Sequence, residues 1–130
     1  MKISLKTHVA APFDDVVTRA RRALEDQGFG ILTEIDVQAT MKAKLDTDVG
    51  PFLILGACNP TLAYRAISAQ ASISVLLPCN VVVRQDGDQV LVEAADPMEM
   101  MRVAGDDALN AVASEATDRL RAALQSLAGP

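Results

Sequence analysis

Two short runs of valine and leucine, separated by a glycine-centred turn, constrain the fold of this chain more than any other feature. The runs occupy residues 81–83 and 90–92, and Asp86-Gly87-Asp88 lies between them. β-Branched side chains favour extended backbone, and Asp-Gly between two such runs is a strong local hairpin signal. We therefore expect an antiparallel pair of strands here, and a sheet against which the other segments must pack.

Three further strands are predicted from the spacing of apolar residues. Residues 2–9 and residues 29–35 alternate between two faces, as a half-buried strand does. Residues 52–55 form a continuous apolar run between Gly50-Pro51 and Gly56, which favours an interior strand that ends at Cys58. The run at residues 73–77 meets Pro78, which marks a strand edge or the start of a new strand because proline donates no hydrogen bond to a neighbouring strand.

Cap residues and helical spacing predict the helices that separate these strands. Proline, asparagine or aspartate marks the start of a helix, and glycine marks its end. Between these end signals, apolar residues recur on one face of the helix. The expected helices are residues 12–27 ending at Gly28, 37–45 capped by Asp36, 60–70 capped by Asn59, a capped turn at Asp96-Pro97, and 106–127 ending at Gly129-Pro130.

This uneven order of strands and helices predicts an α+β fold. We expect a two-layer sandwich, with a mainly antiparallel sheet of about five strands packed by helices that include a long C-terminal helix. A doubly wound sheet is not favoured, because Gly28-Phe29-Gly30 joins a helix to a strand, whereas a phosphate-binding loop joins a strand to a helix. The length of 130 residues is that expected of one domain, spanning 1–130.

Composition excludes several classes of function. A net charge of −5 opposes nucleic-acid binding, and the small aromatic content of 3% offers few surfaces on which bases could stack. The alternating residues 1–6 contain no long apolar run, so we expect neither a signal peptide nor a membrane span. Two cysteines without a secretion signal predict a cytoplasmic protein with free thiols.

Three separated blocks of the sequence resemble a known family. They are GFGILTEIDV at residues 28–37, LGACNP with Leu62-Ala63 at residues 55–63, and LLPCNVVV at residues 76–83, and ADPM at residues 95–98 matches the segment after the hairpin. In order and spacing they are similar to the bacterial and archaeal family known as domain of unknown function 302. The resemblance implies a compact α+β fold and homodimers, and it implies no established activity.

The most informative candidate site is a pair of turns, Cys58-Asn59-Pro60 and Pro78-Cys79-Asn80. Both are predicted at strand ends, where binding residues are common. Cys58 precedes a helix N-terminus, whose dipole can stabilise a thiolate. If the turns are adjacent, the two thiols could form a disulfide, share a soft metal or act as a redox switch; alternatively both are simply small buried side chains.

Other chemistry-bearing residues have structural explanations that compete with function. Glu34 and Asp36 share one face of a predicted strand and could hold a cation, so Glu34 joins the candidate ligand-binding residues, although Asp36 is also a helix cap and Glu34 could pair with a lysine. His8 is expected at the surface unless it lies near either cysteine. The methionines at 98, 100 and 101 have the spacing of a helix that packs on an apolar surface, including that of a dimer.

These observations favour a small binding domain. We expect a small molecule or an anion at the rim formed by the two turns. The alternatives are a thiol-dependent redox or soft-metal protein using Cys58 and Cys79, and a dimeric interaction module without a chemical site. No recognisable catalytic motif is present, so an enzyme is not favoured, and no cofactor is predicted.

Overall fold

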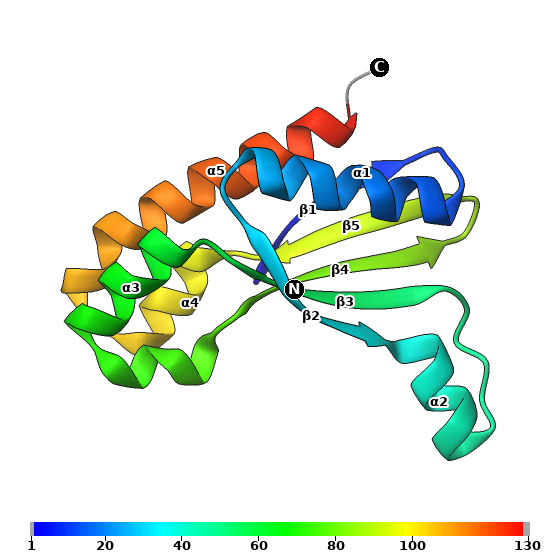
Figure 1. Ribbon diagram of the computed structural model, residues 1–130, viewed down its shortest axis with the longest axis horizontal. Helices are drawn as coiled ribbons and strands as arrows, with labels where there is room; N and C mark the ends of the chain where they lie inside the picture. The colour runs from blue at the N-terminus through cyan, green and yellow to red at the C-terminus, as the bar shows by residue number, and fades with distance from the viewer. Residues whose placement is uncertain (1, 129–130) are drawn as a thin grey trace.

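The computed structural model describes residues 2–128, so the predicted helix stop at Gly129-Pro130 lies outside the described residues. Within this range, strands and α-helices follow one another along the chain, with two short 3₁₀ helices between them (Figure 1). Their bounds are β1 Ser4–Val9, α1 Phe13–Asp26, β2 Gly30–Asp36, α2 Val37–Leu45, β3 Phe52–Cys58, α3 Pro60–Ala69, η1 Ala71–Leu76, β4 Cys79–Asp86, β5 Gln89–Ala95, α4 Pro97–Ala104, η2 Asp107–Leu109 and α5 Asn110–Ala128.

The strands form one antiparallel sheet in the order β1-β5-β4-β3-β2. β4 and β5 form the predicted hairpin, and Gly87 adopts the positive φ of 63° that its turn requires. The α+β class, the antiparallel five-stranded sheet and the long C-terminal helix are confirmed. No helix within residues 2–128 is both long enough and apolar enough to cross a membrane.

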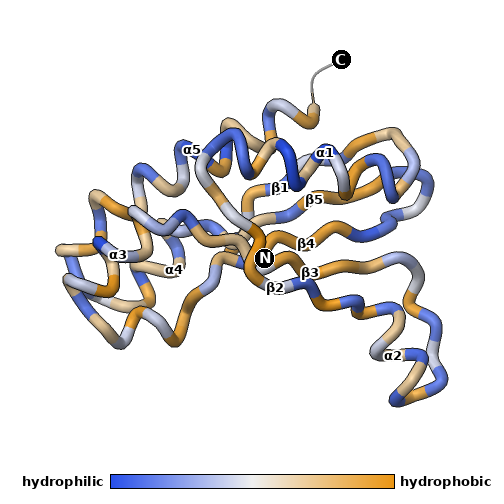
Figure 2. Tube along the Cα trace, viewed as in Figure 1, coloured by the Kyte–Doolittle hydropathy of each residue, from blue (hydrophilic) through white to orange (hydrophobic). Residues whose placement is uncertain are grey.

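The main core lies between one face of the sheet and helices α1 and α5, which lie on the same side of it in Figure 1. Figure 2 shows hydrophobic residues concentrated along the strands, whereas α1 alternates between hydrophobic and hydrophilic residues. The buried members of this core are aliphatic with one aromatic, and those with no exposed surface include Val16, Leu55, Val83, Val90, Val92 and Leu120. Alternation along β3, β4 and β5 therefore determines which face the helices cover.

A second hydrophobic cluster lies beyond one end of the sheet, where α3, η1, α4 and the first half of α5 meet (Figure 1). Its buried members are Leu62, Ala66, Ile73, Met101, Leu109, Val112, Ala113 and Ala116. Met101 is buried here and Met100 packs against the cluster, while Met98 is 42% exposed. The predicted packing of the methionines is thus largely satisfied within the chain.

The strand predicted to start at Phe52 and end at Cys58 is confirmed as β3. The predicted boundaries differ from the structure at two other places. The run before Pro78 forms the 3₁₀ helix η1, and β4 starts directly after this proline. The last helix begins with the separate turn η2, in which the Asp106 carboxylate accepts a hydrogen bond from the Ala108 N–H at 2.9 Å.

Gly56 generates a prediction about the contact between β2 and β3. A Cβ at this position would clash with the Thr33 side chain on β2 and would lie 2.9 Å from Pro78 Cγ. We expect Gly56→Ala to lower the free energy of unfolding by about 1–3 kcal/mol, as overpacking does. Urea denaturation measures the change.

Gly30→Ala is the matched control, because a Cβ on this second strand glycine would meet only the Cys58 carbonyl oxygen at 4.0 Å. It should change stability by less than about 0.5 kcal/mol. Adding Thr33→Ala to Gly56→Ala should restore part of the loss. If Gly56→Ala and Gly30→Ala changed stability equally, contact with Thr33 would not be what restricts the size of the side chain at position 56.

Candidate functional site

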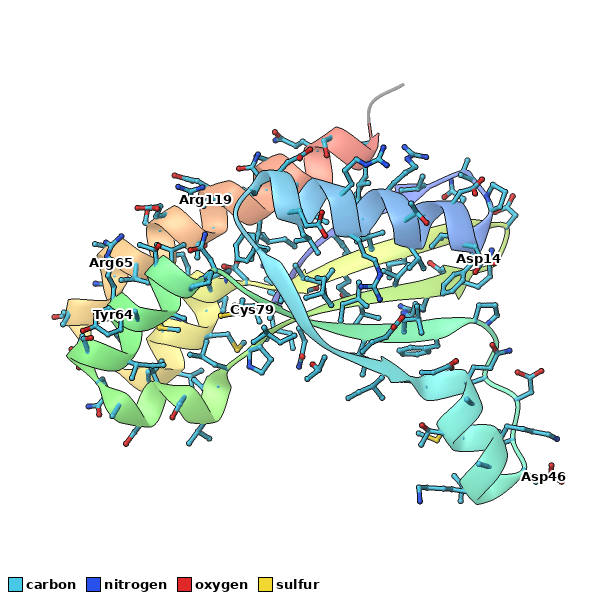
Figure 3. All side chains as sticks on the ribbon, in the orientation of Figure 1. Asp14, Asp46, Tyr64, Arg65, Cys79 and Arg119 are labelled. Carbon is cyan, nitrogen blue, oxygen red and sulfur yellow. The ribbon has the colours of Figure 1, made fainter. Side chains whose placement is uncertain are left out.

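A cavity of about 300 Å³ lies where the second hydrophobic cluster meets the end of the sheet. Its walls come from the first half of β2 with the preceding Phe29, from the ends of β3 and β4, and from α3, η1, α4 and α5. Cys58, Asn59, Pro78 and Cys79 all line it, so four of the predicted site residues share one cavity. In Figure 3 the Cys79 side chain lies at the junction between the sheet and the helices that enclose the cavity.

The pairing of β3 with β4 brings the two predicted turns together. Ala57 and Cys79 are Cα partners across this antiparallel pair, so the end of β3 lies beside the start of β4. Asn59 then starts α3: its Oδ1 accepts a hydrogen bond from the Leu62 N–H at 3.2 Å, and Pro60 occupies the first turn. The sheet register and one helix cap therefore set the position of this end of the cavity.

Alanines create the space between the helices. Ala63 and Ala66 of α3 and Ala113 and Ala116 of α5 line the cavity from two sides. A methyl group leaves unfilled volume where leucine or phenylalanine would reach across to the opposite helix. The deepest of these positions are almost fully enclosed, since Ala66 is 3% exposed and Ala113 is 1% exposed.

No charged side chain lines the cavity within the described residues. Its polar side chains are limited to Asn59, Ser74 and the two thiols. The Ser74 hydroxyl is already used, because it donates a hydrogen bond to the Ala71 carbonyl at 2.8 Å. Asn59 Oδ1 is used as the helix cap, and no hydrogen bond from Asn59 Nδ2 is found within residues 2–128. The cavity is therefore apolar, and Asn59 is the lining residue with an uncommitted amide N–H among residues 2–128.

The two cysteines are neighbours whose side chains start from opposite faces of the sheet. Alternation places Cys79 on the face of its partner Ala57 and Cys58 on the other face. Both thiols are free, and divergent Cβ directions do not favour a disulfide. Burial raises the pKa of the Cys79 thiol, and the nearby Cys58 raises it further. Cys79 is thus held in its protonated, weakly nucleophilic form.

The remaining predicted ligand-binding residues lie outside the cavity lining. Pro60 is exposed at the start of α3, and Asn80 is exposed near the start of β4. Glu34 forms an ion pair of 2.9 Å with Arg21 of α1, so its partner is an arginine rather than the lysine that we expected. These three side chains therefore do not contribute to the walls of the cavity.

The possible metal ligands and His8 are not assembled at this site. His8 Nε2 lies 2.9 Å from the Asp86 carboxylate at the hairpin turn, where β4 ends, whereas Cys79 starts β4. The Asp36 carboxylate accepts from the Ala39 N–H at 2.9 Å, as its role as a cap predicts. Within residues 2–128, no group of three or more histidine, cysteine, aspartate or glutamate side chains could hold a metal ion. The cysteines therefore have neither a histidine base nor additional ligands beside them.

Ion pairs on the outer surface of the cavity link α3 to α5. Arg65 and Arg119 each lie 3.2 Å from a carboxylate oxygen of Glu115, and Arg119 also donates to the Gln27 carbonyl at 3.2 Å. The hydrogen bond from Arg65, followed by that from Arg119, lowers the pKa of Glu115. Figure 3 shows both arginines on the side of the molecule where α3 meets α5. The Glu115–Arg119 pair has the i,i+4 spacing of an ion pair on a helix, whereas no local sequence signal indicates Arg65, which is fifty positions from Glu115.

Comparison with known proteins supports the fold and the family resemblance. The family model described as domain of unknown function DUF302 matches residues 5–127. The crystal structure of an uncharacterized conserved DUF302 protein from Bacillus stearothermophilus is similar, with a TM-score of 0.91 and 25% identity. The match covers 98% of this chain and 99% of that one. No curated protein matches the chain.

The environment of Cys79 predicts a slow thiol. In a Cys58→Ser variant, burial still raises the pKa of Cys79, so iodoacetamide should label it more slowly than in the unfolded chain at neutral pH. The pH–rate profile should rise only above the usual range of a free thiol, which separates a raised pKa from simple shielding. The same variant in denaturant is the control, and a profile that rises below the usual thiol range would contradict the assignment.

Proposed function

This chain belongs to the DUF302 family, and from the geometry of its cavity we propose that it binds a small uncharged molecule. The observation that carries the proposal is an apolar cavity of about 300 Å³ that four residues of the predicted turns help to line. Ligand sites in proteins are typically concave and mostly apolar, with a few polar groups that orient the ligand. This cavity has those properties.

The apolar lining of the cavity supports an occupant. The cavity opens to solvent at a mouth that includes Leu32 and Ile67, so without a ligand it holds water against apolar walls. Ordered water needs two or more polar partners, and these walls supply few. An apolar molecule that displaced this water would gain about 0.8 kcal/mol for each CH₂ group that it buried.

The same walls argue for an uncharged ligand rather than the anion considered from the sequence. Asn59 Oδ1 already accepts from the Leu62 N–H, and no lysine or arginine among the described residues lines the cavity. An ion placed there would lose its hydration without gaining a counter-charge, which is strongly unfavourable. An anion held only by the start of α3 is therefore the weaker hypothesis.

Thiol chemistry is also weaker than ligand binding at this site. The raised pKa of Cys79 opposes both a nucleophilic role and binding of a metal as a thiolate, and a closed zinc site would need ligands beyond the two thiols. Two free thiols are what a reducing cytoplasm maintains, and we propose that location for the protein. In the proposed function the thiols serve as small polarizable wall groups.

We further propose that two copies of the chain pair through the face of the sheet opposite α1 and α5. Figure 1 shows no described helix across the middle of this face. Phe52, Ile54 and Val82 point toward it and are only half-buried. Arg84 and Glu93 lie on the same face on neighbouring strands, so a second copy related by two-fold symmetry can place unlike charges opposite each other.

Pairing through this face is tested by Val82→Lys, which puts a charge at the centre of the half-buried apolar residues. We expect the variant to be monomeric in sedimentation equilibrium while its circular dichroism is unchanged, because like charges would meet at the interface. Val75→Lys is the control, since Val75 is 84% exposed on η1. A wild-type chain that is monomeric at all concentrations would overturn the pairing.

Filling the cavity tests the binding function. Ala113→Leu directs a larger apolar side chain toward the cavity, so we expect the unfolding free energy to change by less than about 1 kcal/mol. Ala123→Leu makes the same change on the same helix in the main core, at a position that is 2% exposed and outside the cavity. There it should lower the unfolding free energy by about 1–3 kcal/mol.

Binding is measured with the fluorophore 1-aminonaphthalene, which is uncharged at neutral pH and small enough for the cavity. Its fluorescence should increase with wild-type protein, and Ala113→Leu should abolish the increase. Ala111→Leu, on an exposed side of α5, controls for the added leucine and should leave the increase intact. Fluorescence that survives in Ala113→Leu, or that is absent from the wild type, would contradict binding in this cavity.

A further inference from the structure

On the basis of the proposed function, we propose the class of molecule that the cavity takes. It is an aliphatic chain of about ten non-hydrogen atoms, with one hydrogen-bond acceptor oxygen at the end that faces Asn59. Three properties of the cavity carry this inference: the kind of side chain in its walls, its volume, and the placement of its polar groups.

The walls favour a flexible hydrocarbon over a flat ring. Among the described residues, Phe29 is the one aromatic in the lining, and only 2% of its surface is exposed. The helices contribute alanine, leucine and valine, and α4 contributes Met101, whose unbranched side chain adapts to irregular partners. An aromatic ring can enter this cavity by apolar contact, but it gains no stacking energy there, because the cavity does not provide paired aromatic faces. An alkyl chain needs only close apolar contact.

The volume limits the length of the chain. One water-sized group takes about 30 Å³ in a liquid, so 300 Å³ accommodates about ten non-hydrogen atoms. A longer molecule would extend through the mouth, where the lining residues Leu32 and Ile67 are 67% and 41% exposed. These exposed side chains would give the extra methylenes weaker contacts than the enclosed walls.

The polar groups give the ligand a direction. Asn59 and both cysteines lie together where β3 ends and β4 begins, whereas the opposite walls, formed by α4 and α5, are apolar. The oxygen of the ligand should therefore face the sheet and its hydrocarbon should run between the helices. The reverse orientation would bury a polar atom without a partner.

The free amide hydrogens of Asn59 select an acceptor. Asn59 Nδ2 lies beside Gly28, 3.0 Å from the place where a Cβ on that glycine would be, and Arg119 Nη1 lies 3.8 Å from the same place. A ligand oxygen that accepts from Nδ2 must therefore reach the Gly28 side of Asn59. Oδ1 is committed to the Leu62 N–H, which leaves Nδ2 as the donor. A ketone, ester or alcohol oxygen fits this donor, whereas a group that only donates does not.

The chain-length part of the inference is tested with the primary alcohols from hexanol to tetradecanol, by displacement of 1-aminonaphthalene. Each added methylene should tighten binding about fourfold while it is buried, and the gain should stop near ten non-hydrogen atoms. Ala113→Leu should move this limit to a shorter alcohol. A gain that continues unchanged to tetradecanol would overturn the volume limit.

The acceptor part is tested with methyl heptyl ketone, which can only accept, and nonanol, which can both accept and donate. Asn59→Asp keeps a good helix cap while it replaces the amide donor with an acceptor. Wild-type protein should bind the two probes comparably. The variant should lose about threefold to tenfold of its affinity for the ketone and keep its affinity for nonanol.

Two controls keep these outcomes interpretable. The first is Asp96→Asn, which replaces the carboxylate cap of α4 with an amide, whereas Asn59→Asp replaces an amide cap with a carboxylate. Asp96→Asn should leave the affinities for the ketone and for nonanol unchanged. The second is the comparison of the two probes, because equal loss of both in Asn59→Asp would show that the residue acts only as a cap. The two proposals can fail separately. If 1-aminonaphthalene binds the wild-type protein and Ala113→Leu prevents this binding, the proposed function is supported. If no alkyl probe then displaces the fluorophore, the proposal of an aliphatic ligand is wrong.

Discussion

The packing of α5 against two separate hydrophobic clusters is the constraint on which the rest of the structure depends. Its 19 residues extend for about 28 Å, which is longer than the strands that it covers. Leu120, Ala123 and Leu124 belong to the main core, whereas Val112, Ala113 and Ala116 belong to the second cluster. A single rigid helix therefore fixes the position of α3, η1 and α4 relative to the sheet.

The cavity follows from that arrangement. The second cluster lies beyond the end of the sheet, so its helices must pack on one another and on the ends of β3 and β4. With alanine at Ala66 of α3 and at Ala113 and Ala116 of α5, they cannot fill the space between them. The Arg65–Glu115 ion pair joins α3 to α5 on the outer surface, where solvent screening makes it weak. The apolar walls thus enclose space rather than collapse into it.

Much of the fold could be predicted because its signals are local. Period-two alternation, the Asp86-Gly87 turn and the caps at Asp36 and Asn59 each act within a few residues, so the sequence shows them directly. The cavity could be predicted only in part. The two turns at Cys58 and Cys79 indicated the part of the cavity that lies next to the sheet. The sequence around Ala113 and Met101, in contrast, is that of ordinary helices whose apolar side chains pack in a core. Whether an alanine faces a close neighbour or a void depends on long-range packing, which periodicity does not encode.

Asn59 links the stability of α3 to the contents of the cavity. Its Oδ1 caps the helix, while its Nδ2 is the donor that we assign to a ligand. A ligand that accepts from Nδ2 would hold the amide in the rotamer that the cap requires, so binding and helix formation would favour each other. α3 contacts the rest of the molecule through the Arg65–Glu115 pair and through apolar side chains around the cavity. A bound ligand would therefore stabilise α3 against local unfolding. This stabilisation would be larger for α3 than for the other helices and the sheet.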